Sequence, residues 1–318
     1  MRARAAVIAS DQLAEESAQE FLAAGGSALG AVTAGFFAAA GAYAGVLFGP
    51  VSLLTVGVGV GARAFDGRLR QPGLGAKRPR GFTRTETIPD AARLAVPASV
   101  DALMVALAYD GQSPGSVLRS AIVRAERSGA EARVALYRRI RAVGAAAMTE
   151  PPVVRAVLHV AGASEGGLVT PSDLKPAREL DHPASSRVVD GGALVEVPWA
   201  ETGASARDLE ALGAGGVILA VDVRGVFAAL AFRRVTDGLS IDELDQEAPL
   251  AAVPVERGVA RVAPGTPLEC PAPIAVRLDG SGKAVEVLGE PSALRATPSA
   301  PYRLAREPGS PDVRVVRP

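Results

Sequence analysis

The first half of the chain has the hydrophobic spacing of amphipathic helices. Apolar residues recur every three or four positions over 114–128, which predicts a helix that begins at Pro114 and ends before Gly129. Similar spacing predicts helices over 11–24, over 99–109 and after residue 129. Thr170 and Asp173 have the spacing of a capping box and predict one further short turn of helix.

From about residue 193 the pattern changes to that of β-strands. Two apolar runs, 216–221 and 226–232, flank the turn residues Asp222 to Gly225, which is typical of a hairpin. Further strands are predicted over 259–262, 274–278 and 284–288. Helices followed by strands of this kind indicate an α+β fold in which helices cover a sheet.

The segment 21–62 contains 42 residues and no charged side chain. Its length allows a transmembrane hairpin that turns at Gly49 and Pro50. Ten glycines and the β-branched residues of 51–61 instead favour a buried helix followed by a buried strand. Neither an aromatic belt nor an arginine cluster flanks both ends, as an anchored span would show.

Composition narrows the classes of function. The 34 basic and 34 acidic residues give a formal net charge of +0, so a nucleic-acid partner is not expected. A single cysteine excludes an intrachain disulfide, and one cysteine with two histidines makes a zinc site improbable. The apolar run at the N-terminus is too short for a secretory signal, so we expect a cytoplasmic protein without metal or cofactor.

Several motifs occur in the order in which γ-glutamyltransferases carry them. A helix, a glycine pair and a second helix occupy 13–35, and Asp66-x-Arg68 precedes Pro72. Alanine-rich helices follow over 94–129, and GGLVTPSDL over 166–174 is similar to the family's Gly-Gly-x-x-Thr-x-x-Asp-Leu. The chain therefore resembles the γ-glutamyltransferases (glutathione hydrolases) over about residues 8–291.

The resemblance implies the N-terminal-nucleophile hydrolase fold, a sandwich of four αββα layers, here in a shortened form. It implies one domain over 1–292, with a helix-rich part over 1–192 and a strand-rich part over 193–292. Residues 293–318 are rich in proline and arginine and are expected to form a tail on the surface or without fixed structure. Glutathione metabolism is the context that the resemblance implies.

The family's nucleophile is a threonine that self-cleavage places at the start of a strand. Asp222 and Gly225 match the end of that strand and its turn, and this register puts Gly215 at the nucleophile position. Glycine has no hydroxyl, so neither self-cleavage nor acyl transfer is available by this route. The long segment that precedes the cleavage site in the family is also missing, because only a few residues separate 197–206 from Gly215.

Two further motifs also differ from those of the family at positions that its reaction uses. Glu269 and Cys270 stand where the family has a serine pair that holds the substrate carboxylate, and a glutamate there repels a carboxylate. The segment 289–293 keeps the outline of the oxyanion loop but not its glycine pair. The resemblance therefore assigns no catalytic residue in this chain.

Arg68 is the one family site residue that remains. The resemblance implies that it binds the carboxylate of a small ligand, and the alternative is a structural arginine paired with Asp66. Leu69 replaces the glutamate that follows this arginine in the family.

No replacement active site stands out among the other polar residues. His159 is expected in the core or at its edge, and His182 lies beside Asp181 without a serine to complete a triad. Cys270 next to Glu269 lacks the positive surroundings of a reactive thiol. The remaining acid/base candidates are Asp222, Asp242 and Asp245.

Three hypotheses follow from the sequence. The leading one is a non-catalytic γ-glutamyltransferase-like protein that binds a small amino-acid-like ligand, or pairs with a copy of itself or a related chain. The second is a divergent amide hydrolase or acyltransferase of the same fold with another nucleophile. The third is a membrane-associated structural protein that uses segment 21–62.

Overall fold

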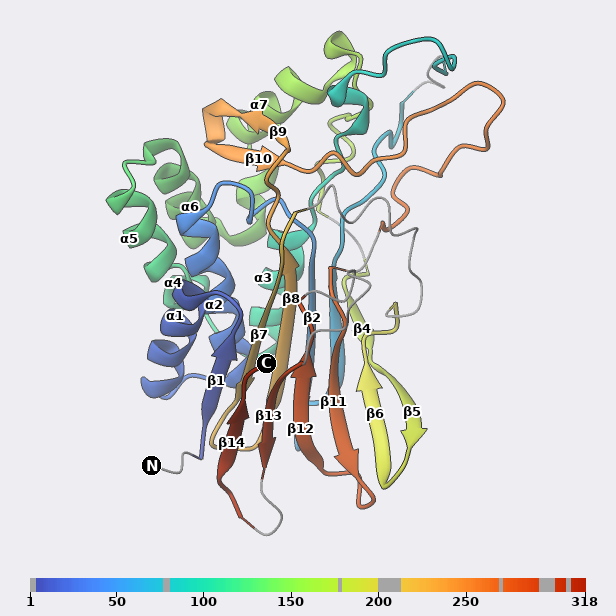
Figure 1. Ribbon diagram of the computed structural model, residues 1–318. Helices are drawn as coiled ribbons and strands as arrows, with labels where there is room; N and C mark the ends of the chain where they lie inside the picture. The colour runs from blue at the N-terminus through green and yellow to red at the C-terminus, as the bar shows by residue number, and fades with distance from the viewer. Residues whose placement is uncertain are drawn as a thin grey trace.

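Two antiparallel six-stranded sheets form the centre of the computed structural model, which describes residues 4–76, 81–176, 179–199, 213–268, 271–291, 301–306 and 310–318 (Figure 1). The first sheet consists, in spatial order, of β1 (Ala6–Ala9), β7 (Gly215–Val221), β8 (Phe227–Arg233), β2 (Val51–Gly57), β3 (Gly61–Gly67) and β4 (Asp181–Pro183). The second consists of β14 (Val313–Val316), β13 (Tyr302–Arg306), β12 (Ala284–Gly289), β11 (Ile274–Asp279), β6 (Gly192–Glu196) and β5 (Ser185–Val189). A separate small ribbon pairs β9 (Leu239–Ile241) with β10 (Gln246–Ala248).

Helices cover one face of the first sheet. They are α1 (Gln12–Ala23), α2 (Ala28–Ala42), α3 (Ser99–Tyr109), α4 (Pro114–Val117), α5 (Arg119–Arg127), α6 (Glu131–Val143) and α7 (Pro151–Ala161). Short 3-10 turns lie at Asp90–Arg93, Gly144–Thr149, Ala163–Glu165 and Asp242–Leu244. The helix α2 packs on β7 and β8 and is itself flanked by α1 and α5, so it is buried on every side.

The uncharged segment is therefore a buried helix followed by a buried strand, as its glycines and β-branched residues predict. The apolar strand is shorter than 51–61, because Gly59 and Gly61 have positive φ and turn the chain into β3. Asp66 and Gly67 lie within β3, although an Asp-Gly pair is typical of a turn. None of the helices in the described ranges combines the length and the apolar character that a membrane crossing requires.

The two sheets pack face to face around a second core. Alternate residues of β7 divide between the two cores: Val217, Leu219 and Val221 face the second sheet, whereas Ile218 and Ala220 face the helices. From the second sheet, Val276, Val287 and Leu304 complete this inter-sheet core and are fully buried.

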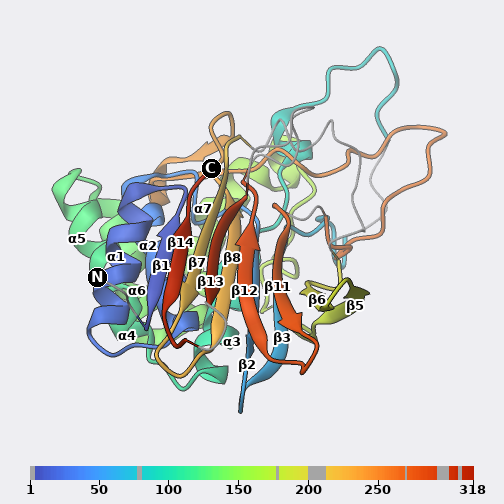
Figure 2. The same cartoon turned by 60° about the horizontal axis from the view of Figure 1, so that its bottom comes forward.

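The α+β class is confirmed, and the described residues form a helix–sheet–sheet sandwich. Within the described ranges no helix lies over the outer face of the second sheet, which Figure 2 shows towards the viewer. That face carries ion pairs instead: Glu286 lies 3.2 Å from Arg277 and 3.9 Å from Arg303, and Arg187 lies 2.8 Å from Glu196. Charged cross-strand pairs suit a sheet face that water covers. Because no described helix covers this face, the shortened fold has three of the expected four layers in the part described.

Some predicted boundaries are wrong. The helix predicted over 114–128 is two helices that join at Leu118, and no strand forms over 259–262. Thr170 and Asp173 make the bonds of a capping box, with the Thr170 amide donating to Asp173 Oδ2 at 2.8 Å, but only a turn follows. The carboxylate of Asp173 is buried and accepts further bonds from the amides of Gly73 and Leu74, so it serves as a tie between two loops.

The expectation of an unstructured or surface tail is also wrong for most of the described C-terminal residues. Residues 302–306 and 313–316 form β13 and β14, and β13 pairs with β12 so that Leu304 lies opposite Val287. The alternation of Tyr302 and Leu304 with polar residues is too short to stand out among the prolines. At the end of the chain, Arg317 reaches back to Glu15 of α1 with a closest distance of 2.6 Å.

The C-terminal strands should contribute to the stability of the whole fold. We expect Leu304→Ala to lower the free energy of unfolding by about 2–5 kcal/mol, because it leaves a cavity in the inter-sheet core. Val315→Ala on the neighbouring strand, where the side chain is 44% exposed, should change it by about 0.5 kcal/mol or less. Urea unfolding of both variants checks this; equal small effects would mean that these strands do not belong to the core.

Candidate functional site

Gly215 is the first residue of β7, which is the second strand of the first sheet and lies between β1 and β8. The alternation along β7 places position 215 on the inter-sheet face, together with Val217. A Cβ atom built on Gly215 would lie 2.1 Å from the carbonyl oxygen of Pro291. The chain therefore has no room for a side chain at this position unless the backbone moves.

A row of residues crosses the sheet from Gly215 to Arg68. Gly215 pairs with Arg233, the Arg233 amide donates to Pro50 O at 3.2 Å, and Val51 pairs with Gly67. Three strand spacings put the backbone of Arg68 about 14 Å from Gly215. One pair further along β2 and β3, Ser52 lies opposite Asp66 on the inter-sheet face.

The carboxylate of Asp66 is buried and binds two arginines. Arg68 donates to it from Nε and from Nη2, both at 2.9 Å, and from its backbone amide at 3.0 Å; Arg70 donates from its Nη2 at 3.0 Å. Burial on its own raises the pKa of Asp66, but the hydrogen bonds and charges of the two arginines outweigh it and hold that pKa below its ordinary value. One negative charge thus faces two positive charges at this position.

Trp199 covers the guanidinium of Arg68. The Arg68 Cζ atom lies 4.8 Å from the centre of the indole ring, and the indole N–H donates to Ser52 Oγ at 3.0 Å. The imidazole of His182 meets the edge of the same indole at 5.5 Å between ring centres, and its Nε2 is buried without a hydrogen-bond partner in the described residues. The cluster is therefore partly aromatic and holds Arg68 in one orientation.

The other two arginines of this region have different partners. Arg70 Nε is buried without a partner in the part of the chain that the structure describes. Arg233 donates from Nε to Pro271 O and from Nη1 to Gly213 O, each at 2.9 Å, and so fixes the chain next to β11 and β7. Guanidinium groups held in this way are suited to binding a carboxylate or another anion.

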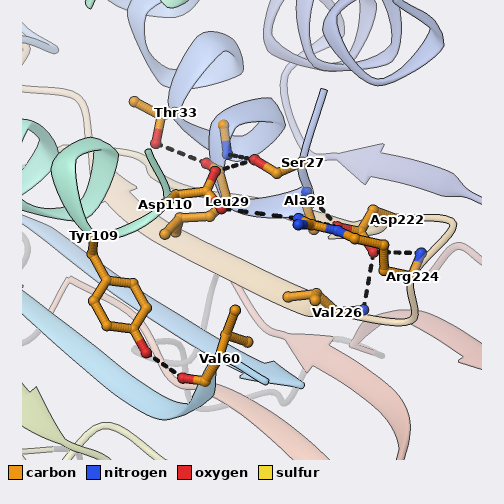
Figure 3. Close-up of polar contacts among 11 residues, drawn as sticks. Ser27, Ala28, Leu29, Thr33, Val60, Tyr109, Asp110, Asp222, Arg224 and Val226 are labelled. Carbon is orange, nitrogen blue, oxygen red and sulfur yellow. Dashed lines mark hydrogen bonds and ion pairs between the residues drawn. The ribbon is translucent and has the colours of Figure 1, made fainter. Parts of the chain in front are cut away.

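Asp222 follows the end of β7 that is opposite to Gly215. Figure 3 shows its contacts. Its carboxylate accepts bonds from the amides of Arg224 and Val226, at 2.9 and 3.0 Å, and from the amide of Ala28 at the start of α2, at 3.3 Å. These contacts close the β7–β8 turn and hold it against α2. Asp222 therefore has a structural role and does not meet the residues around Arg68.

The remaining candidates are dispersed. His159 is exposed on the last turn of α7, not in the core, and its Nδ1 lies 2.8 Å from Glu243, which raises the histidine pKa. Asp242 accepts a bond from Ser240, and Asp245 forms an ion pair with Arg133. Glu269, Cys270 and residues 292 and 293 lie outside the described residues. No group of three or more potential metal ligands occurs among the described residues.

No sequence motif singles out Ser52, Trp199, Arg70 or Arg233, which the fold brings to this region. Ser52 had a detectable signal, because a polar residue within an apolar central strand needs a buried partner. Trp199 had none, since it follows β6 and reaches Arg68 only when the two sheets pack together.

No protein-family model matches the sequence, and no curated protein sequence matches it. Several solved structures share its fold. Cephalosporin acylase from Bacillus halodurans gives a TM-score of 0.71 at 12% identity, covering 91% of this chain and 77% of the acylase. LmbA2991HD gives a TM-score of 0.61 at 15% identity, covering 91% of this chain and 78% of that protein. The γ-glutamyltranspeptidase from Pseudomonas nitroreducens, complexed with L-DON, gives a TM-score of 0.50 at 21% identity, covering 64% of this chain and 74% of the transpeptidase. These similarities confirm the predicted N-terminal-nucleophile hydrolase fold.

The carboxylate of Asp66 should be essential for stability. We expect Asp66→Asn to lower the free energy of unfolding by about 3–5 kcal/mol, because two buried guanidiniums lose their counter-charge. Asp181→Asn makes the same chemical change in the more exposed pair with Arg63 and should cost about 1 kcal/mol or less.

The same variant has a characteristic pH dependence. A carboxylate whose pKa is lowered in the folded protein stabilises it above the unfolded-state pKa, and this contribution is lost as the pH falls through the folded-state pKa. The free energy of unfolding of the unmodified chain should therefore exceed that of Asp66→Asn by the full amount above about pH 4, and this difference should become smaller below that pH. A difference that stays constant down to strongly acidic pH in denaturant titrations would contradict this assignment.

Proposed function

We propose that this chain is a γ-glutamyltransferase-like protein that does not carry out the N-terminal-nucleophile reaction and instead binds a small, carboxylate-bearing ligand beside Arg68. The observation that carries the first part is the position of the Pro291 carbonyl, 2.1 Å from where the Cβ of residue 215 would be.

The chemistry of the reaction supports the first part. Attack on an amide needs a hydroxyl at the start of the strand and a base beside it, and Gly215 supplies no side chain. The tetrahedral intermediate also needs N–H donors for its oxyanion. Pro291 has no N–H, and the Glu290 amide donates to Pro273 O at 3.2 Å. A carbonyl oxygen next to Gly215 would repel the developing negative charge.

The charges around Asp66 support the second part. Two guanidiniums share one carboxylate, so the cluster has a surplus positive charge where the sheets meet. The Nη1 group of Arg68 makes no hydrogen bond with the described residues, since Nε and Nη2 take both oxygens of Asp66. A ligand carboxylate would therefore add to the pair of Arg68 and Asp66 without displacing it.

Intact mass and turnover test the non-catalytic assignment. The purified chain should have a single mass near 32.3 kDa and should release no product from a γ-glutamyl anilide. Gly215→Thr should not restore cleavage, and both Gly215→Thr and Gly215→Ala should lower the melting temperature because their Cβ meets Pro291. Gly115→Ala is the control, since its Cβ meets nothing closer than 3.6 Å. Two fragments, or turnover that survives Gly215→Ala, would identify an active enzyme with another nucleophile.

Calorimetric titration with L-glutamate tests the ligand site separately. We expect saturable binding that Arg68→Gln weakens at least tenfold, because the ligand carboxylate loses a charge-assisted hydrogen bond. Arg63→Gln on the opposite face of β3 should bind as the unmodified chain does. Absence of binding, or an equal loss in both variants, would refute the ligand site and leave the non-catalytic assignment intact.

A further inference from the structure

A trough of about 890 Å³ runs between α1 and α5, on the helix side of the first sheet. Both helices pack against α2, which forms the floor of the trough at Ala34. The volume is in the range of small-molecule sites. The trough is separate from the cluster around Asp66, which lies on the inter-sheet face.

Each wall is one face of a helix. The α1 wall consists of Ser17, Glu20, Phe21 and Ala24, and the α5 wall of Ser120, Val123, Arg124 and Arg127. Both sets have the i, i+3, i+4, i+7 spacing of a single helical stripe. Each helix therefore turns one complete stripe of side chains towards the trough, and the two stripes do not pack against each other.

Polar contacts join the surrounding helices near the two ends of the trough. At one end, Ser27 Oγ donates to Asp110 and brings the start of α2 beside the end of α3 (Figure 3). Burial raises the pKa of Asp110, although the bond from Ser27 opposes this. At the other end, Arg124 Nη2 lies 3.4 Å from Glu16 Oε2 and 3.4 Å from Leu13 O.

The lining is positively charged. Arg119, Arg124 and Arg127 line it against the single acid Glu20, which leaves a net charge of +2 along the lining. Arg119 and Arg127 form no ion pair with any described residue, whereas Arg124 is partly neutralised by Glu16. Two cationic side chains on one wall therefore have no counter-charge within the described part of the chain.

The neighbouring groups indicate what kind of molecule fits. Gln112 and Ser120 add hydrogen-bond donors to the arginines, whereas the Ser116 hydroxyl already donates to Ser113 O at 2.7 Å. The largest apolar side chains in the lining are Phe21, Val117 and Val123. An amphipathic helix would need a continuous apolar groove, which this lining does not provide. A small polar molecule with several anionic oxygens satisfies both the charge and the donors.

We propose that the trough between α1 and α5 binds a small polyanion that carries phosphate or carboxylate groups, with Arg119, Arg124 and Arg127 as its cationic contacts. This inference is independent of the proposed function, because the two sites are on opposite faces of the first sheet. Guanidinium groups bind both phosphate and carboxylate as bidentate partners, so the shared chemistry is that of a polyanion of either kind.

Calorimetric titration of the full chain with pyrophosphate, with citrate and with acetate tests the site. At low salt we expect one molecule of pyrophosphate or citrate to bind per chain, acetate to bind at least tenfold more weakly, and sodium chloride to weaken all binding. A preference for pyrophosphate over citrate, or the reverse, assigns the source of the anion to a phosphate or a carboxylate compound.

Matched variants locate the binding. Arg119→Gln with Arg127→Gln should weaken pyrophosphate binding at least tenfold without changing the melting temperature. The control, Arg141→Gln with Arg155→Gln, removes two exposed arginines from α6 and α7 outside the trough and should leave binding unchanged. Arg68→Gln should also leave it unchanged. No binding, an equal loss in the control, or a loss confined to Arg68→Gln would overturn the proposal.

Discussion

The shared carboxylate of Asp66 is the interaction on which this end of the molecule depends. Two arginines can lie between the sheets only because one buried anion binds both of them. The pair then fixes its neighbours: Arg68 supports the indole of Trp199, and the backbone of Arg70 bridges to Val96 and to Pro267. The segments around Arg70, Val96 and Pro267 are thereby joined to one another, and Leu69, Ala95 and Ala252 form a small core of their own there. Removal of the carboxylate would leave the arginines without compensation and the loops without their anchor.

Much of the fold could be predicted from the sequence because its elements are local. The hairpin of β7 and β8 has long apolar runs on both sides of a turn, and α2 is uncharged because it is covered on all sides. β13 could not be predicted in this way. Its few alternating residues become a strand only because β12 offers a free edge and the inter-sheet core accepts Leu304. Local composition contains no information about that edge.

The candidate sites show the same limit. The motif of Asp66 and Arg68 is short and local, so sequence analysis found it, together with the alternative that the two residues pair with each other, which they do. The contact of Trp199 with Ser52 joins residues that are 147 positions apart, and the walls of the trough come from helices about 100 residues apart. Spacing along the chain cannot detect such sites, although a polar residue in a central strand and a basic stripe on a helix indicate that partners are needed.

A glycine at the start of β7 need not weaken this fold. The inter-sheet core takes its apolar side chains from Val217, Leu219 and their partners further along β7, and position 215 lies at its rim. A glycine there allows the Pro291 carbonyl to approach, so backbone fills the space that a side chain would otherwise need. The outer face of the second sheet is similar, since charged cross-strand pairs suit it to water where none of the described helices covers it. Helix layer and inter-sheet core are thus held by the packing of apolar side chains and backbone, and position 215 contributes a side chain to neither of them.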